Sequence, residues 1–133
     1  MTQKYKELLL KDLCARLPYH VKCKIWLKDG TIEEGFLDLQ HNYGNVLQDA
    51  FYYNKIKDIK PYLRPMSSMT KEEYKELKLI SPYYGFAPYE YIYDWCPNYE
   101  MIDFCNKNHF DYRGLIPKNL AIEVTEENNP YKI

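Results

Sequence analysis

The densest group of chemically reactive side chains lies between Asn106 and Arg113. If this segment is extended, His109, Asp111 and Arg113 point to the same side of the backbone. A histidine–aspartate pair beside an arginine could act as a general base on a phosphate ester, which would make the protein a hydrolase. The alternative is structural: Asn108 or His109 ends a helix, while Asp111 and Arg113 pair or hold loop backbone. We favour the structural interpretation, because no second motif anchors the three side chains.

The histidines and cysteines lack the spacing of a metal site. His20, His41 and His109 form no HxH or i,i+4 pair, and no two cysteines have the short gap of a zinc knuckle or a redox pair. We therefore expect no metal and no cofactor. We expect the four cysteines to be reduced thiols, mostly buried, with Cys14 and Cys23 on the apolar faces of their elements.

A second candidate site is a basic surface on the first predicted strand. Lys22, Lys24 and Lys28 alternate with apolar residues and share a face with Trp26. Basic residues interleaved with an aromatic ring are typical of proteins that bind single-stranded RNA or DNA. The alternative is an ordinary solvated strand face, on which a helix from the second half of the chain covers Trp26. We favour this alternative over nucleic-acid binding.

Aromatic residues gather in a third candidate region, between positions 82 and 95. The chain contains 15 tyrosines, and tyrosine and tryptophan are enriched at the centres of binding interfaces. An equally weighted alternative is that these rings cover the core while their hydroxyl groups stay in water. The candidate binding residues are Tyr83, Tyr84, Tyr89, Tyr91, Tyr93 and Trp95.

The segment from Val21 to Leu39 organises the chain. Its first half alternates apolar and polar residues with the period of a half-buried strand. Asp29-Gly30 follows, and this dipeptide predicts a type I′ hairpin turn with positive φ at both residues. In the returning strand the apolar phase changes across Gly35, which predicts a bulge or sharp bend. A strand bent in this way would form the first corner of a small barrel.

The other elements complete an α+β protein. Its predicted fold is a small SH3/Sm-like β-barrel preceded by an N-terminal helix and decorated by C-terminal helices. We expect a single domain over 1–133, with helix and barrel in 1–66 and a helical or irregular extension in 67–133 packed on it. The predicted elements are a helix over 3–17, strands over 46–50, 51–56 and 60–64 with a 3₁₀ turn at 56–59, helices over 71–80 and 99–107, an extended stretch to 124 and a frayed tail.

The hairpin also resembles the first Sm signature. It shares the alternating apolar residues, the run Leu27-Lys28-Asp29-Gly30, a glycine five positions later and then Leu37. The second Sm signature, with its Arg-Gly, is missing. The resemblance therefore implies barrel topology and not RNA binding.

Three longer runs resemble a family of small proteins of unassigned activity from gut anaerobes and their phages and mobile elements. The runs are LLLKDLCARLPYHVKCK at 8–24, DIKPYLRPMSSMT at 58–70 and NKNHFDYRGLIPKNLAIE at 106–123. The resemblance implies a cytosolic protein associated with a phage or mobile element. It assigns no site residues.

Bulk properties narrow the function classes. A chain of 133 residues suits one domain, and a net charge of −1 argues against a strong overall field toward nucleic acid or membrane. Neither a signal peptide nor a membrane-spanning stretch is visible, so we expect a cytoplasmic protein without a membrane partner.

We predict a non-catalytic binding module that contacts a host or phage protein or a small ligand, in host takeover or defence evasion. A homo-oligomer is compatible with the sequence. The alternatives are nucleic-acid binding through the basic strand and hydrolysis through His109, Asp111 and Arg113.

Overall fold

The computed structural model describes residues 2–37, 56–80 and 99–131. The strands are β1 (Val21–Leu27), β2 (Ile32–Leu37), β3 (Ile56–Leu63) and β4 (Ile122–Glu123). The helices are α1 (Gln3–Arg16), α3 (Lys71–Ile80) and α4 (Tyr99–Lys107), with short 3₁₀ turns η1 (Leu17–Tyr19) and η3 (Met66–Ser68).

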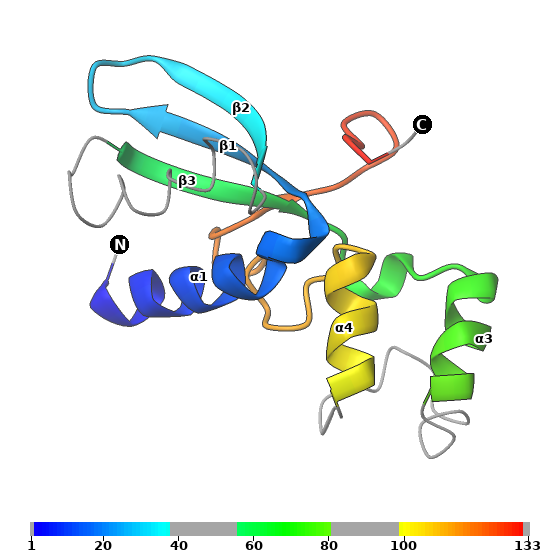
Figure 1. The fold of residues 1–133 in the computed structure, drawn as a ribbon. Helices are drawn as coiled ribbons and strands as arrows, with labels where there is room; N and C mark the ends of the chain where they lie inside the picture. Colours follow the sequence, from blue (N-terminus) through cyan, green and yellow to red (C-terminus); the bar gives the residue numbers. More distant parts are fainter. Residues whose placement is uncertain (1, 38–55, 81–98, 132–133) are drawn as a thin grey trace.

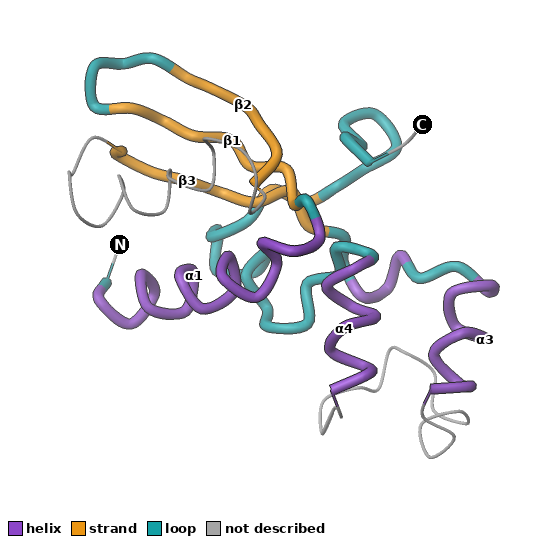
Figure 2. Tube along the Cα trace, in the orientation of Figure 1, coloured by secondary structure: helices purple, strands orange, loops and turns teal. Residues whose placement is uncertain are grey.

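A mixed sheet forms the centre of the fold, and the helices lie on one side of it and beyond its end (Figures 1 and 2). The strands are hydrogen-bonded in the order β2-β1-β3-β4. β2 and β3 each pair antiparallel with β1, whereas β4 pairs parallel with β3. α1 runs beneath the sheet, and α3 and α4 stand side by side beyond it. None of the helices in the described ranges is long and apolar enough to span a membrane.

The predicted α+β class is confirmed, but the sheet is open and not closed into a barrel. A closed barrel requires the two edge strands to pair with each other, and β2 and β4 lie at opposite ends of the strand order. The prediction of a closed barrel is therefore wrong for the part of the chain that the structure describes. The strands predicted over 46–50 and 51–56 lie, apart from Ile56, outside the described residues.

Gly35, the predicted bend of that barrel, lies in a regular ladder. All six residues of β2 pair with β1 without a register shift. The change of apolar phase has another cause, because Ile32 and Leu37 lie on opposite faces of β2: Ile32 is 53% exposed and Leu37 is buried. The irregularity of the sheet lies between Trp26 and Leu27, opposite β3.

The β1–β2 hairpin forms where the sequence predicts it, but its turn differs from the type I′ turn expected at Asp29-Gly30. The amide of Gly30 donates to the carbonyl of Leu27 at 3.1 Å, and the amide of Leu27 donates to the carbonyl of Thr31 at 2.8 Å. Gly30 has φ +91°, whereas Asp29 has no positive φ. This is a three-residue loop closed by a glycine bulge. Lys28 is therefore an exposed loop residue and not part of the strand.

β3 runs without interruption from Ile56 to Leu63, so the 3₁₀ turn predicted at 56–59 is wrong. Pro61 lies within this strand, opposite Cys23 of β1. β4 pairs only with Tyr62 and Leu63, which leaves β3 as an edge of the described sheet as far as Pro61. A proline is tolerated there, because an edge position needs no amide donor on its outer side.

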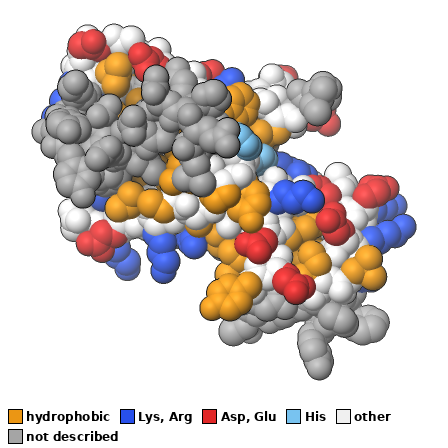
Figure 3. Space-filling view, in the orientation of Figure 1, with side chains coloured by type: hydrophobic (Ala, Val, Ile, Leu, Met, Phe, Trp, Pro, Cys, Tyr) orange, Lys and Arg blue, Asp and Glu red, His pale blue; other side chains and the backbone are white. Residues whose placement is uncertain are grey.

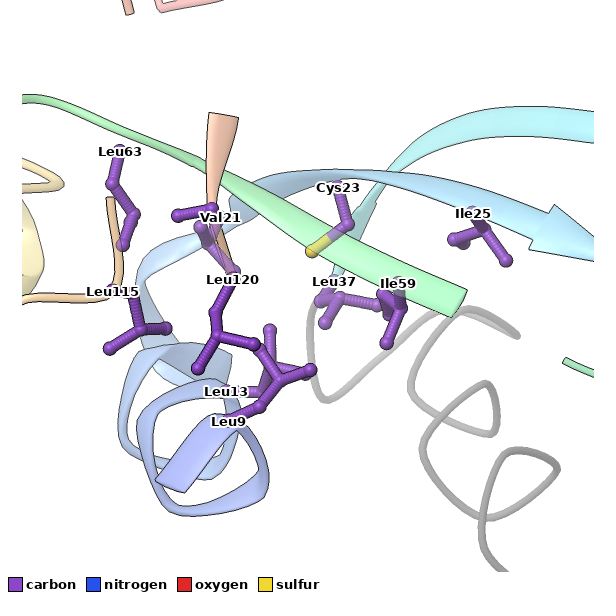
Figure 4. Packing of buried hydrophobic residues seen from close by; sticks show 11 residues of the cluster. Leu9, Leu13, Val21, Cys23, Ile25, Leu37, Ile59, Leu63, Leu115 and Leu120 are labelled. Carbon is purple, nitrogen blue, oxygen red and sulfur yellow. The ribbon is translucent and has the colours of Figure 1, made fainter. Parts of the chain in front are cut away.

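The inner face of the sheet and α1 enclose the larger apolar cluster (Figure 4). Leu9 and Leu13 rise from α1 toward the strands, as their helical spacing predicts. Leu115 and Leu120, from the loop before β4, close the cluster from the side. The strands contribute Val21, Cys23, Ile25, Leu37, Ile59 and Leu63.

A second apolar cluster joins α3, α4 and the residues that follow α4. Few of its side chains are branched aliphatics; sulfur-containing and aromatic side chains predominate. α3 begins with the predicted capping box, in which the Glu73 amide donates to Thr70 Oγ1 at 3.1 Å and the Thr70 amide donates to Glu73 Oε1 at 3.0 Å. The buried members are Met69, Leu77, Met101, Phe104, Cys105 and Phe110.

Candidate functional site

The face of the sheet opposite α1 carries lysine and aromatic side chains from three strands. Successive residues of a strand point to opposite faces, and Val21, Cys23 and Ile25 of β1 are buried in the cluster that the sheet forms with α1. The even-numbered residues of β1, with their neighbours on β2 and β3, therefore form the outer face. We call Lys22, Lys24, Trp26, Phe36 and Lys60 the lysine–aromatic face.

Each aromatic ring of this face lies beside lysine ammonium groups. Nζ of Lys24 and Nζ of Lys60 lie 5.5 and 5.8 Å from the centre of the Trp26 ring. Nζ of Lys22 lies 5.3 Å from the centre of the Phe36 ring, and Phe36 is 40% exposed. Lys24 and Lys60 are directly opposite each other on β1 and β3, and like charges in this position repel. Such a surface offers rings for stacking and cations for a bound anion.

Two carboxylates lie on the same outer face and reduce its charge. Glu34 accepts the Tyr62 hydroxyl at 2.6 Å and lies 4.0 Å from the Lys22 ammonium group. Burial and this hydrogen bond raise the pKa of Tyr62 to about 12. Asp58 lies opposite Trp26 and accepts an amide of its own strand. With three lysines and two carboxylates, the described residues of this face carry a small positive charge.

Tyr131 closes one end of the lysine–aromatic face, so the predicted frayed tail is wrong as far as this residue. Its hydroxyl donates to the Tyr62 carbonyl at 2.7 Å and accepts the Lys22 amide at 3.0 Å. The hydroxyl therefore takes the place of a ladder hydrogen bond between β3 and β1. Its ring contacts the Phe36 ring edge-on, with the ring centres 6.5 Å apart. It also stacks on the His109 ring, with the ring centres 3.7 Å apart.

His109 ends α4 at the position that glycine usually occupies. Its amide donates to the Asn106 carbonyl at 3.2 Å, and the Phe110 amide donates to the Cys105 carbonyl at 2.8 Å. This pair of bonds is the Schellman motif. His109 has φ +63°, a conformation that is strained for a residue with a Cβ atom. Glycine would adopt this backbone conformation without strain, but only histidine supplies the ring that stacks on Tyr131.

The three candidate catalytic side chains have different surroundings. Both carboxylate oxygens of Asp111 accept backbone amides, those of Leu115 at 2.8 Å and Ile116 at 2.9 Å. Arg113 donates to a buried carboxylate of α1 at 3.2 Å. Nδ1 of His109 is buried without a hydrogen-bond partner, and burial lowers the pKa of this residue to about 4. The geometry does not bring the three side chains to one reacting point and favours structural roles for Asp111 and Arg113.

A buried charged cluster joins α1 to the loop after α4. Asp12 and Arg16 are completely buried, whereas Cys14, predicted on the apolar face, is exposed. Arg16 donates to both Asp12 carboxylate oxygens, at 2.7 and 3.1 Å, and to the Phe110 carbonyl at 2.6 Å. Arg113 adds a third hydrogen bond to Asp12. The cluster fixes the position of the loop that leads to β4.

A cavity of about 660 Å³ lies beside Tyr131. The end of β3, the start of α3, the end of α4 and the segment 124–131 form its walls. Its charged lining residues are Arg64, Lys107 and Glu126, and hydroxyl and amide side chains supply most of the rest. The cavity therefore suits a polar ligand.

The guanidinium group of Arg64 is already held by its neighbours. Its two terminal nitrogens each donate to Glu73 at 2.7 Å, and they also donate to the carbonyls of Ser68 at 3.2 Å and Asn108 at 3.4 Å. The group also lies 4.3 Å from the centre of the Phe110 ring. Burial alone would raise the pKa of Glu73, but the hydrogen bonds from Arg64 outweigh this effect together with those from Thr70, and the pKa is lowered. Arg64 is a structural wall of the cavity.

The tyrosine-rich candidate surface lies outside the described residues, as do His41 and Cys96. Within the described ranges, no three histidine, cysteine, aspartate or glutamate side chains are grouped as metal ligands would be. Burial raises the pKa of the Cys105 thiol to about 12 and raises that of Cys23 as well, so neither thiol is reactive. The candidate binding residues concerned are Tyr83, Tyr84, Tyr89, Tyr91, Tyr93 and Trp95.

Three residues of the described site were not predicted from the sequence. Lys60 and Phe36 join the face only through strand register, which no local pattern specifies. Tyr131 lies in a polar, acidic terminal segment, which is typical of a frayed tail. The one local signal was Asn129, whose side-chain oxygen accepts the Tyr131 amide at 2.9 Å, as asparagine does in turns.

Comparison with known proteins assigns no family to the chain. No protein-family model, no curated protein and no solved structure matches it.

Proposed function

We propose that this protein is a non-catalytic binding module whose lysine–aromatic face binds single-stranded nucleic acid. The observation that carries the proposal is that the ammonium groups of Lys24 and Lys60 lie 5.5 and 5.8 Å from the centre of the Trp26 ring. An unpaired base can stack on a ring while cations beside that ring contact the flanking phosphates. Stacking of this kind contributes about 1–3 kcal/mol per base and tolerates different sequences.

The charge distribution favours short-range contacts over long-range attraction. The chain has a net charge of −1, and acidic and basic side chains are interspersed over the helical part of the molecule in Figure 3. Such a protein does not attract duplex DNA through a broad positive surface. Bases that are already unpaired can reach the rings without the energy of opening a duplex. The proposal is therefore restricted to single strands.

A protein partner is the competing ligand class for a binding module of this kind. It would use the exposed apolar side chains at the rim of the face, Ile32 and Phe36. The lysines beside both rings favour the polyanion. If the chain belongs to a phage or mobile element, as its resemblance implies, the bound strand would come from host or element, and binding would serve host takeover or defence evasion in the cytoplasm.

Charge reversal on the face is the test. The variant Lys24→Glu/Lys60→Glu is expected to bind a fluorescent 12-nucleotide single strand at least about 10-fold more weakly, because two phosphate contacts become repulsive. The control is Lys75→Glu/Lys78→Glu on α3, which makes the same change of charge. It also removes a lysine that lies beside an aromatic ring, because Lys78 Nζ lies 5.1 Å from the centre of the Tyr74 ring. Fluorescence anisotropy measures both.

The control should stay within about 2-fold of the unmodified protein, because a distant exposed charge contributes little. Urea unfolding of both variants verifies that they are folded. Equal losses in the two double variants would show a nonspecific charge effect and contradict the proposal. Absence of binding to any RNA or DNA strand would overturn it in favour of a protein partner.

A further inference from the structure

The cavity beside Tyr131 and the lysine–aromatic face share one side chain. The Tyr131 ring contacts Phe36 of the face and also lines the cavity. Its hydroxyl lies at the end of the face, between the backbones of Lys22 and Tyr62. A nucleic-acid strand that lies across Trp26 and Phe36 therefore leads toward the cavity.

We propose that this cavity binds one nucleotide, the terminal residue of a strand bound on the lysine–aromatic face, and that it also accepts a free nucleoside monophosphate. The proposal rests on the function proposed above and adds a second site to it. Its volume of about 660 Å³ lies within the range of about 300–1,000 Å³ typical of small-ligand sites.

The lining matches the two parts of a nucleotide. Ser68, Thr70, Thr125 and Asn129 bring hydroxyl and amide groups. The Ser68 and Thr125 hydroxyls donate to Pro65 and Asn128 and can still accept a hydrogen bond from a base or sugar, whereas the Thr70 hydroxyl and the Asn129 amide accept backbone amides and can still donate one. Tyr131 adds an aromatic wall. These side chains carry no charge, as suits a neutral base and sugar.

Lys107 is the cation expected to meet the phosphate. It is exposed at the end of α4 and lines the cavity. Arg64 lines the cavity too, but its terminal nitrogens already donate to Glu73 and to two carbonyls, so it serves as a fixed wall. Glu126 lies in the same lining and opposes an anion. Among the lining residues that the structure describes, one available cation and one opposing carboxylate suit a single phosphate group and disfavour a di- or triphosphate.

Isothermal titration calorimetry with AMP, CMP, GMP and UMP tests this site, with inorganic phosphate and the corresponding nucleosides as separate arms. At least one monophosphate is expected to bind more tightly than phosphate alone and than its nucleoside. Lys107→Glu is expected to weaken that binding by about 5-fold and Glu126→Gln to strengthen it by about 2-fold, because exposed charges make contributions of this size. Lys75→Glu on α3 is the matched control and should leave binding unchanged.

The outcomes separate this inference from the proposed function. Binding of single strands without binding of any monophosphate would overturn the inference and leave the proposed function intact. Equal binding of phosphate and monophosphates would overturn the nucleotide assignment, as would binding that Lys107→Glu does not change. Lys24→Glu/Lys60→Glu should weaken binding of the nucleic-acid strand by at least about 10-fold and leave monophosphate binding unchanged. Equal weakening of both would contradict a separate site.

Discussion

Replacing Asp12 by alanine is expected to lower the free energy of unfolding by about 3–5 kcal/mol, because it leaves the guanidinium group of Arg16 buried without its counterion. Both residues are completely buried. The Phe110 carbonyl would remain as the acceptor for Arg16, and Nη1 of Arg16 already lacks a partner. Arg113 would lose the same carboxylate. Urea unfolding followed by circular dichroism measures the change.

Two further variants show whether the buried charge is the cause. Glu7→Ala removes an exposed carboxylate from the same helix and should change stability by less than about 0.5 kcal/mol. Asp12→Leu/Arg16→Met removes both charges and should recover most of the loss, since apolar side chains of similar size often replace a buried ion pair without penalty. A loss below about 1 kcal/mol for Asp12→Ala would contradict this account of the cluster.

Lowering the pH from 7 to 4 is expected to remove about 3 kcal/mol of stability through His109 alone. Burial, together with the positive charges of Arg16, Arg64 and His20, lowers the pKa of this residue from 6.5 to about 4. In the unfolded chain the imidazole takes up its proton near pH 6.5. Between these two pH values the unfolded state binds more protons than the folded state, so the free energy of unfolding decreases as the pH falls.

Comparison with His109→Asn isolates this effect from the titration of carboxylates. Asparagine tolerates the left-handed conformation at this position and does not titrate. The stability of the unmodified protein should fall more steeply than that of the variant between pH 7 and pH 4, and the two curves should become parallel below about pH 4. His20→Asn removes an exposed histidine that also has a positive φ and is expected to retain the steep fall. Parallel curves for His109→Asn over the whole range would contradict a buried neutral His109.

Local signals in the sequence predicted the elements of the fold better than their arrangement. The Thr70–Glu73 capping box and the alternation of β1 are each specified within a few residues, and both form. The predicted stripe of α1 forms in part, because Leu9 and Leu13 are buried whereas Cys14 is exposed. The prediction of a closed barrel was wrong because closure depends on which strands pair, and pairing is set by contacts between segments that are distant in the sequence. Gly35 showed the error most directly: a change of apolar phase is also produced by one exposed isoleucine, Ile32.

The candidate site was predictable only in part for the same reason. Lys22, Lys24 and Trp26 follow from the alternation of a single strand. Lys60 joins them because the β1–β3 register places it opposite Lys24. The buried pair Asp12–Arg16 has the i,i+4 spacing of a helical ion pair. Ion pairs with this spacing normally lie on the exposed surface of a helix, so the spacing did not indicate that this pair is buried.

The salt dependence of single-strand binding is the most direct test of the lysine–aromatic face as a nucleic-acid site. If Lys22, Lys24 and Lys60 each neutralise a phosphate, the logarithm of the binding constant should fall with the logarithm of the salt concentration with a slope of about −2. In Lys24→Glu/Lys60→Glu the slope should become shallower than about −1, whereas Lys75→Glu/Lys78→Glu should retain it. A slope near zero, or the same slope in all three proteins, would contradict the proposed function.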